Sequence, residues 1–142
     1  MQDLYESRNS IYCYEGTNVL INRKNIKELD KLEEYDDFVS TIKLSELFMQ
    51  GITGDFNIIH FTNIHRYLFE NLYQFAGLFR TENIAKGDFR FAEWEYIEPE
   101  LKKLLDSLAK ENYLNGLSKE DLSKKLAYYM AELNVLHPFR ER

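Results

Sequence analysis

Apolar side chains recur at intervals of three to five residues along four segments of this chain, which is the spacing of amphipathic α-helices. Only two prolines, Pro99 and Pro138, are present, so long stretches are free to be helical. The spacing therefore predicts an all-α fold. The apolar positions that define the four helices are Ile26, Leu29, Leu32, Phe38, Ile42 and Leu47; Ile64, Leu68, Leu72 and Phe75; Ile97, Leu101, Leu104 or Leu105, and Leu108; and Leu122, Leu126, Tyr129, Leu133 and Leu136.

Residue types at the ends of these segments predict where the helices start and stop. Gly77 follows the second segment and is placed as its stop. Pro138 disfavours helical backbone angles at His137, which ends the fourth segment there. Ser118 and Asp121 form a Ser-x-x-Asp signature of a helix N-terminus. The fourth helix is therefore expected to run from residue 118 to the His-Pro corner.

Two segments do not fit a helix. The stretch "YCYEGTNVLIN" (residues 12–22) holds a glycine and two asparagines and predicts an irregular lead-in over residues 1–25. Residues 81–91 are strand-like around a Lys-Gly-Asp turn, which predicts a short β-hairpin. Within the hairpin, Gly87 lets the backbone approach a ligand, Lys86 can meet a phosphate, and the edge can pair with an extended peptide. A plain surface hairpin is the alternative.

Size, charge and cysteine content limit the class of protein. The 142 residues are most simply one domain, residues 1–142, with the 44% apolar and 30% charged content of a soluble globular protein. A net charge of −6 argues against direct nucleic-acid binding, which needs Lys and Arg to displace counterions. Neither a signal peptide nor an apolar run of roughly 20 residues is found, so no membrane association is expected. Because Cys13 is the only cysteine, no disulfide can form within the chain, and we expect a cytoplasmic protein.

The His-Pro corner that ends the fourth segment is the strongest candidate for chemistry. An ordinary histidine has a pKa near neutrality, so His137 can act as a general base. Glu141 lies four residues later and can bind a hard cation such as Mg²⁺, which carries substrate phosphates. A base, a metal-binding carboxylate and nearby arginines predict a phosphoryl- or nucleotidyl-transfer site. The alternative is that His137 only caps or packs the helix end.

The other two histidines, His60 and His65, are five residues apart, which does not place them on one face of a helix. We interpret both as ordinary surface or partly buried residues. Cys13 has no activating partner close to it in the sequence and is interpreted as structural. No second cluster has metal-ligand spacing, and the hairpin at residues 81–91 is the second candidate after the His-Pro corner.

Three segments, in the right order, resemble the Fic family, which includes bacterial cell filamentation proteins. "HPFRE" after a "YYMAELNVL" helix resembles the start of the family signature His-Pro-Phe-x-Asp/Glu-Gly-Asn-Gly-Arg. The segment "IHRYLFENLYQFAGLFRTENIAKGDFRFAEWEYIEPEL" is similar to the helix, flap and following helix of Fic domains, and "YCYEGTNVLIN" is similar to their lead-in. The resemblance covers residues 12–141 and implies a helical domain with a β-hairpin flap.

The resemblance also implies an activity, the transfer of AMP from ATP to a hydroxyl side chain of a target protein. By the match, His137 would deprotonate the target hydroxyl, which attacks the α-phosphate, and Glu141 would hold Mg²⁺ on the nucleotide phosphates. The flap, residues 81–91, would hold the target segment by backbone pairing, and Phe139 would pack inward and anchor the loop. Family members also transfer UMP or other phosphate-containing groups. The residues assigned to nucleotide binding are Lys86, Gly87, Phe139 and Arg140.

The chain departs from the family pattern after Glu141. Arg142 stands in place of the first glycine, so the signature is truncated to residues 137–142, and the helices that follow it in the family are missing. Those glycines let successive N–H groups converge on a phosphate. We therefore expect weak or absent catalysis in this chain, with an apolar face of the fourth helix left partly open. An inactive module that pairs with a partner through the flap is the alternative function, and a simple His/Glu hydrolase is a third hypothesis with little support.

Fic enzymes are often restrained by a helix bearing Ser/Thr-x-x-x-Glu-Gly/Asn. A match at residues 107–112 lies between the flap and the signature, where the family does not keep that helix, and is interpreted as a coincidence. An inhibitor is expected instead from lost C-terminal sequence or from a separate small antitoxin, as in a toxin–antitoxin pair.

Overall fold

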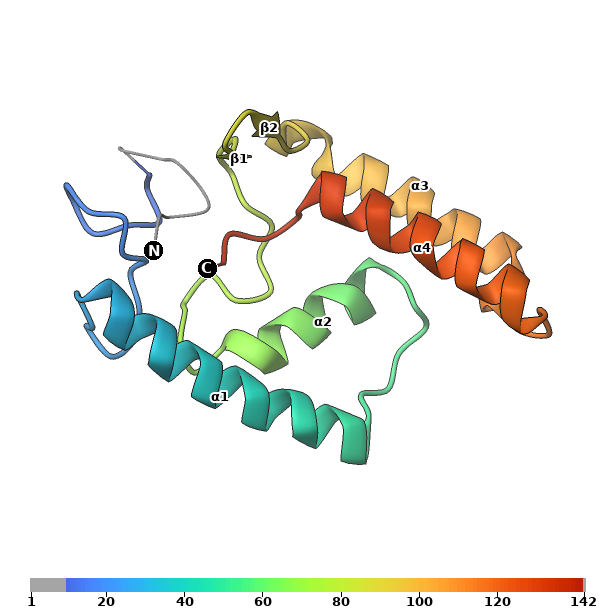
Figure 1. The fold of residues 1–142 in the computed structure, drawn as a ribbon, viewed down its shortest axis with the longest axis horizontal. Coiled ribbons are helices and arrows are strands. Elements are labelled where there is room, and N and C mark those ends of the chain that lie inside the picture. The colour runs from blue at the N-terminus through green and yellow to red at the C-terminus, as the bar shows by residue number, and fades with distance from the viewer. Residues whose placement is uncertain (1–9, 142) are drawn as a thin grey trace.

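The computed structural model describes residues 10–141 and confirms an all-α fold with one small antiparallel hairpin (Figure 1). Residues 1–9 of the expected lead-in and Arg142 of the signature lie outside the described residues. Short 3₁₀ turns at Trp94–Tyr96 and Asn112–Leu114 flank the third helix. In chain order, the helices and strands are α1 (Leu29–Gln50), α2 (Ile58–Phe69), β1 (Ala85–Lys86), β2 (Phe89–Arg90), α3 (Ile97–Lys110) and α4 (Lys119–Leu136).

The helices form two antiparallel pairs, with α1 against α2 and α3 against α4 (Figure 1). Helix α2 also contacts α3, which joins the two pairs. The chain leaves α4 at the end nearest the hairpin and returns toward α2, so the last residues lie in the middle of the molecule, between the two pairs (Figure 1).

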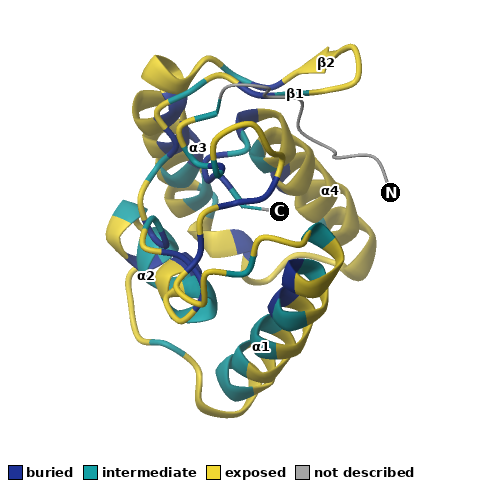
Figure 2. Cartoon of the chain, turned by 90° about the vertical axis from the view of Figure 1, so that its left-hand side faces the viewer, coloured by how far each residue is buried: buried dark blue, intermediate teal, exposed yellow. Residues whose placement is uncertain are grey.

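Two main clusters of buried side chains hold this arrangement. One joins the lead-in to α1 and to the chain after α2, and the other lies between α3 and α4. Figure 2 shows that most of α4 is nevertheless exposed, and only Tyr129 and Leu136 of that helix are buried. The buried members of the clusters are Cys13, Val19, Leu20, Leu32, Leu72 and Tyr73 in the first, and Leu101, Leu104, Leu114, Tyr129 and Leu136 in the second.

Both ends of α4, after Ser118 and before His137, follow the sequence prediction. Ser118 accepts a hydrogen bond from the backbone N–H of Asp121 at 3.1 Å, so the predicted N-terminus of α4 is confirmed. Helix α2 begins with a cap that the sequence analysis did not identify, because Asn57 accepts a hydrogen bond from the N–H of His60 at 3.0 Å. Within residues 10–141, no helix is both long and apolar enough to cross a membrane.

The predicted end of the second helix was wrong. Helix α2 ends at Phe69, well before Gly77, and the chain then makes turns in which the N–H groups of Leu72 and Tyr73 bond to the carbonyl of Phe69. These turns bury Leu72 and Tyr73 in the first cluster, where the Tyr73 hydroxyl donates to buried Asp36 at 2.7 Å. Burial of two large side chains outweighs the helical periodicity.

Three of the apolar positions that define the predicted helices are exposed, and for Leu126 this agrees with the expected open face of the fourth helix. Phe38 is 64% exposed, Ile42 is 44% exposed and Leu126 is 46% exposed. The periodicity of apolar residues identified the correct helices, but it could not show how wide a face of each helix its neighbours cover. That width depends on tertiary packing.

Candidate functional site

The chain leaves α4 through a residue in the left-handed conformation, His137. The N–H of His137 still donates to Leu133 O at 2.9 Å, but the residue itself is left-handed, with φ 43° and ψ 67°. Pro138 disfavours a right-handed helical conformation at His137 and has no N–H to continue the hydrogen-bonding pattern of the helix. The chain therefore turns off the helix axis, and residues 138–141 (the signature loop) run across the molecule toward α2.

Arg80 holds the backbone of this corner in place. Its guanidinium Nε donates to the carbonyl of His137 at 2.7 Å, a terminal nitrogen donates to that of Leu136 at 2.9 Å, and its own N–H donates to Pro138 O at 2.9 Å. The carbonyls at a helix C-terminus carry partial negative charge, which favours a cation. Arg80 is only 1% exposed, and burial lowers the pKa of its guanidinium, which still keeps its charge at neutral pH.

The same guanidinium also holds the two ends of the hairpin segment (residues 81–91), which we call the flap. It donates to the carbonyl of Glu82 at 2.8 Å and to that of Ala92. The N–H of Ala92 in turn donates to Val135 O at 2.9 Å, near the end of α4. One buried arginine thus fixes the base of the flap relative to His137.

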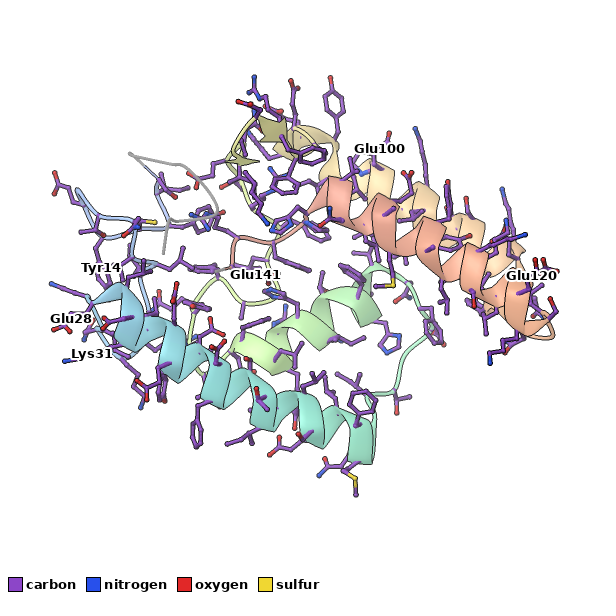
Figure 3. All side chains as sticks on the ribbon, in the orientation of Figure 1. Tyr14, Glu28, Lys31, Glu100, Glu120 and Glu141 are labelled. Atoms are coloured by element: carbon purple, nitrogen blue, oxygen red, sulfur yellow. The ribbon has the colours of Figure 1, made fainter. Side chains whose placement is uncertain are left out.

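His65 of α2 reaches the same loop from the other side. The N–H of Gly77 donates to Nδ1 of His65 at 2.9 Å, so the neutral ring carries its proton on Nε2, which donates to the carboxylate of Glu141. The interpretation of His60 and His65 as surface or partly buried residues was wrong, since both are 7% exposed. Figure 3 labels Glu141 between the loop after α4 and α2, where this bond forms.

Phe139 points inward and packs among aromatic rings. It stacks on His65, with 3.8 Å between the ring centroids and 16° between the planes, and on Phe61 at 5.7 Å and 15°. Phe79 lies at 5.5 Å on a tilted plane. The side chain is 6% exposed, so it can anchor the loop but presents little surface to a ligand.

The ring of His137 lies beneath the flap. Its centroid is 4.5 Å from that of Phe91, and the residue is half-buried. Burial is the main cause that lowers the pKa of His137; the negative charge of Glu141 opposes the shift, while the positive charges of Arg80, Arg140 and Lys86 add to it. The imidazole is therefore neutral at pH 7 and able to accept a proton.

A groove of about 510 Å³ lies between α2 and α4, and His137 and Glu141 both line it. The groove therefore brings together a neutral base and a carboxylate, while none of the residues that line it is Lys or Arg. The remaining residues that line the groove are Phe61, Ile64, His65, Leu68, Phe69, Met130, Leu133, Asn134, Pro138 and Phe139.

The other residues assigned to nucleotide binding lie elsewhere. Lys86 and Gly87 are exposed at the tip of the flap, and Gly87 has the positive φ of 60° that its turn requires. Arg140 is 2% exposed and points toward the lead-in, with Nε 3.6 Å from a carboxylate oxygen of Glu82 and a terminal nitrogen 4.0 Å from Cys13 Sγ. None of the three lines the groove.

A resident metal cluster is not built into the described part of the chain. Among residues 10–141, no group of three or more His, Cys, Asp and Glu side chains is placed to hold a metal ion together. Mg²⁺ is commonly bound by one or two carboxylates together with substrate phosphates and water. A single carboxylate at Glu141, which lines the groove and is partly exposed, fits that mode of binding.

Two residues that organise the site were missed by the sequence analysis. Neither Arg80 nor His65 was assigned a role there. His65 and its partner Glu141 are 76 residues apart in the chain, and Arg80 lies 57 residues from His137. No local pattern links such pairs.

Glu111 of the motif at residues 107–112 forms hydrogen bonds that hold the end of α3 against α4. Glu111 accepts hydrogen bonds from Lys125 at 2.6 Å and from the Tyr129 hydroxyl at 2.7 Å. The bond from Lys125 is the main cause that lowers the pKa of Glu111, whereas burial, followed by the bond to Glu111, raises that of Tyr129 to about 12. These contacts agree with the interpretation of the motif as a coincidence.

Comparison with known proteins gives consistent matches over this whole region. The model of the Fic/DOC family matches residues 55–141. The chain is 37% identical over 137 residues to Protein adenylyltransferase VbhT of Bartonella schoenbuchensis, covering 96% of this chain and 29% of that protein. It is 33% identical to Probable protein adenylyltransferase Fic of Escherichia coli, over 99% of this chain and 69% of that protein.

Solved structures show the same fold. The BepC protein of Bartonella tribocorum, with bound AMPPNP, superimposes with a TM-score of 0.83 at 27% identity, over 92% of this chain and 69% of that one. The chain spans between about a third and two thirds of the length of these proteins.

Proposed function

Because the chain belongs to the Fic/DOC family, we propose that it forms the transfer site of a protein adenylyltransferase, which moves AMP from ATP to a hydroxyl group of a target protein. The observation that carries the proposal is that a neutral, half-buried His137, whose ring contacts Phe91 of the flap, lines the same groove between α2 and α4 as the carboxylate of Glu141. The names of two relatives and the AMPPNP bound by a structural neighbour support the choice of nucleotide.

In the proposed reaction, His137 accepts the proton of the target hydroxyl. The hydroxyl oxygen then forms a bond to the α-phosphorus of ATP, the bond from that phosphorus to the bridging oxygen breaks, and pyrophosphate leaves. Mg²⁺ supplies charge neutralisation on the phosphates and would be held by Glu141. Lys86 and Gly87, at the exposed tip of the flap, are proposed to face the nucleotide or the target rather than the groove floor.

The flap is proposed to select the target. An extended target segment would pair with the backbone of the hairpin edge, and this pairing would place its hydroxyl near His137. Strands β1 and β2 contain two residues each, and β2 is exposed, which supports an edge available for one more strand. We further propose that a small antitoxin-like protein restrains the activity, and that the protein acts in the cytoplasm.

The proposed function is tested by labelling. The protein is incubated with α-labelled ATP, Mg²⁺ and bacterial lysate, next to His137→Ala and, as a matched control, His60→Ala. Labelled bands are expected with the wild type and the control but not with His137→Ala, because only that variant lacks the base. Equal labelling by all three proteins would remove the proposed catalytic role.

A second candidate function is a binding module that pairs with a partner through the flap without turning over nucleotide. The exposed hairpin edge would serve this function equally well. Calorimetry with ATP and Mg²⁺ separates the two, since micromolar binding in the groove is expected only of the transferase.

A further inference from the structure

We propose that His65 is a positioning residue that orients the carboxylate of Glu141 toward the cation carried by the nucleotide phosphates. This inference rests on the proposed function. It assigns a role to a buried side chain of α2 that lies outside the His-Pro corner and forms no part of the proton transfer.

The ring of His65 is fixed at its far edge by the backbone. The N–H of Gly77 donates to Nδ1 at 2.9 Å, and this bond leaves the proton on Nε2, facing Glu141. Gly77 has φ +77°, and a Cβ at this position would lie 2.8 Å from Cβ of Arg66. A glycine is therefore needed for the chain to pass close enough to α2 to set the tautomer of His65.

Two aromatic neighbours hold the ring of His65 in place. Phe139 stacks on one side at 3.8 Å between centroids, and Phe69 packs at 4.7 Å with a tilt of 39°. Phe139 belongs to the same loop as Glu141 and lies two residues before it. His65 thus contacts the loop twice, through its ring face and through Nε2. Because the ring is held in place, a rotation of the Glu141 side chain would break its hydrogen bond from Nε2.

The carboxylate of Glu141 remains accessible to a ligand in the groove. The side chain of Glu141 is 30% exposed and lines the groove, whereas that of His65 is 8% exposed. A carboxylate that binds a metal ion is commonly hydrogen-bonded by a second residue that holds its direction, and loss of that residue typically weakens metal binding by about 10- to 100-fold. The geometry around Glu141 matches this arrangement.

A buried histidine with a purely structural role has different partners, as His60 of the same helix shows. His60, on the same helix, is also 7% exposed, and both of its ring nitrogens bond to backbone groups: Nδ1 accepts from the N–H of Phe56, and Nε2 bonds to the carbonyl of Ile52. His65 instead directs Nε2 at an acidic side chain in the groove. His60 is therefore a matched control for the cost of removing a buried histidine from α2.

The test measures Mn²⁺ affinity of the protein with AMPPNP by electron paramagnetic resonance, in the wild type and three variants. His65→Asn keeps an acceptor near the Nδ1 position for Gly77 but cannot reach Glu141. His65→Gln keeps a donor for Glu141, because its amide N–H₂ lies near the former Nε2 position, but it offers no acceptor near the Nδ1 position for Gly77. His60→Asn is the control, and thermal unfolding verifies that each variant is folded.

His65→Asn is expected to weaken Mn²⁺ binding by about 10-fold or more, and His65→Gln by less than about threefold. His60→Asn is expected to leave the affinity unchanged. Equal weakening by His65→Asn and His65→Gln would show a purely structural role and overturn the inference, as would an unchanged affinity in a folded His65→Asn variant. A wild-type protein that binds no Mn²⁺ with AMPPNP would instead overturn the proposed function, and the inference with it.

A second measurement keeps the inference testable if His65→Asn does not fold. Nitrogen NMR of the wild-type imidazoles, without nucleotide, is expected to show a protonated Nε2 and a bare Nδ1 at His65. The Nε2 proton is expected to exchange faster with water in Glu141→Gln than in the wild type. The opposite tautomer at His65 would overturn the inference without reference to nucleotide transfer.

Discussion

Replacing Arg80 by methionine is expected to loosen the flap and the His-Pro corner together. The change removes one buried donor group from four backbone carbonyls, those of Leu136 and His137 at the corner and of Glu82 and Ala92 at the flap. Methionine fills a similar volume, so the main loss is of hydrogen bonds rather than of packing. The four carbonyls would then remain buried without their donor.

The size of the effect follows from these bonds. A hydrogen bond to a charged group contributes about 1.5–3 kcal/mol, but the four bonds share one side chain and are not additive. Each buried carbonyl left without a donor costs about 1–3 kcal/mol, so a combined loss of about 3–5 kcal/mol is expected. In a domain of this size, each kcal/mol lowers Tm by about 2–4 °C, so a fall of about 6–20 °C is expected.

The assay is thermal unfolding followed by circular dichroism, combined with amide hydrogen exchange. Arg80→Lys is expected to recover only part of the stability, because one ammonium group cannot span the positions that the planar guanidinium reaches. Arg23→Met is the matched control, since the Arg23 side chain makes a single bond, from Nε to the carbonyl of Glu70 at 2.7 Å. Exchange should accelerate in residues 81–92 and 137–141 together, because Arg80 is their common partner.

Two results would refute this reasoning. If Arg80→Met lowered Tm no more than Arg23→Met, the hydrogen bonds of Arg80 would contribute little to stability. If exchange accelerated in only one of the two segments, Arg80 would not couple the flap to the corner.

Three further predictions concern His137, two glycines and Glu111. Burial holds the pKa of His137 below its ordinary value, so kcat/KM is expected to stay high down to about pH 6.5 and to fall below that pH. The stability contributed by the neutral ring is likewise present above about pH 6.5 and is lost as the pH falls through the lowered pKa. Profiles of rate and of Tm against pH check both predictions. Gly116→Ala should cost about 1–2 kcal/mol in chemical denaturation because φ is +80°, whereas Gly77→Ala should cost more, since its Cβ would also meet Arg66; equal costs would contradict the close approach at Gly77. Glu111→Gln should leave AMPPNP affinity unchanged by calorimetry, and a clear gain in affinity would show that this glutamate restrains the site after all.

The sequence by itself was sufficient for the elements and for the chemistry at one corner. Periodic apolar residues located all four helices, Ser118 set the start of α4, and Gly87 marked the turn of the flap. Pro138 fixed the break after Leu136 because the restriction it imposes acts on adjacent residues. Such signals depend on neighbours within a few positions and can be read without knowing the fold.

Only the tertiary structure decided which distant residues share the site. The early end of α2 at Phe69 came from burial of Leu72 and Tyr73, which periodicity cannot weigh against helix formation. The contact of His65 with Glu141 joins residues 76 positions apart, because α2 and the loop after α4 pack side by side. The sequence specified the functional groups, whereas long-range packing and buried hydrogen bonds fixed their mutual orientation.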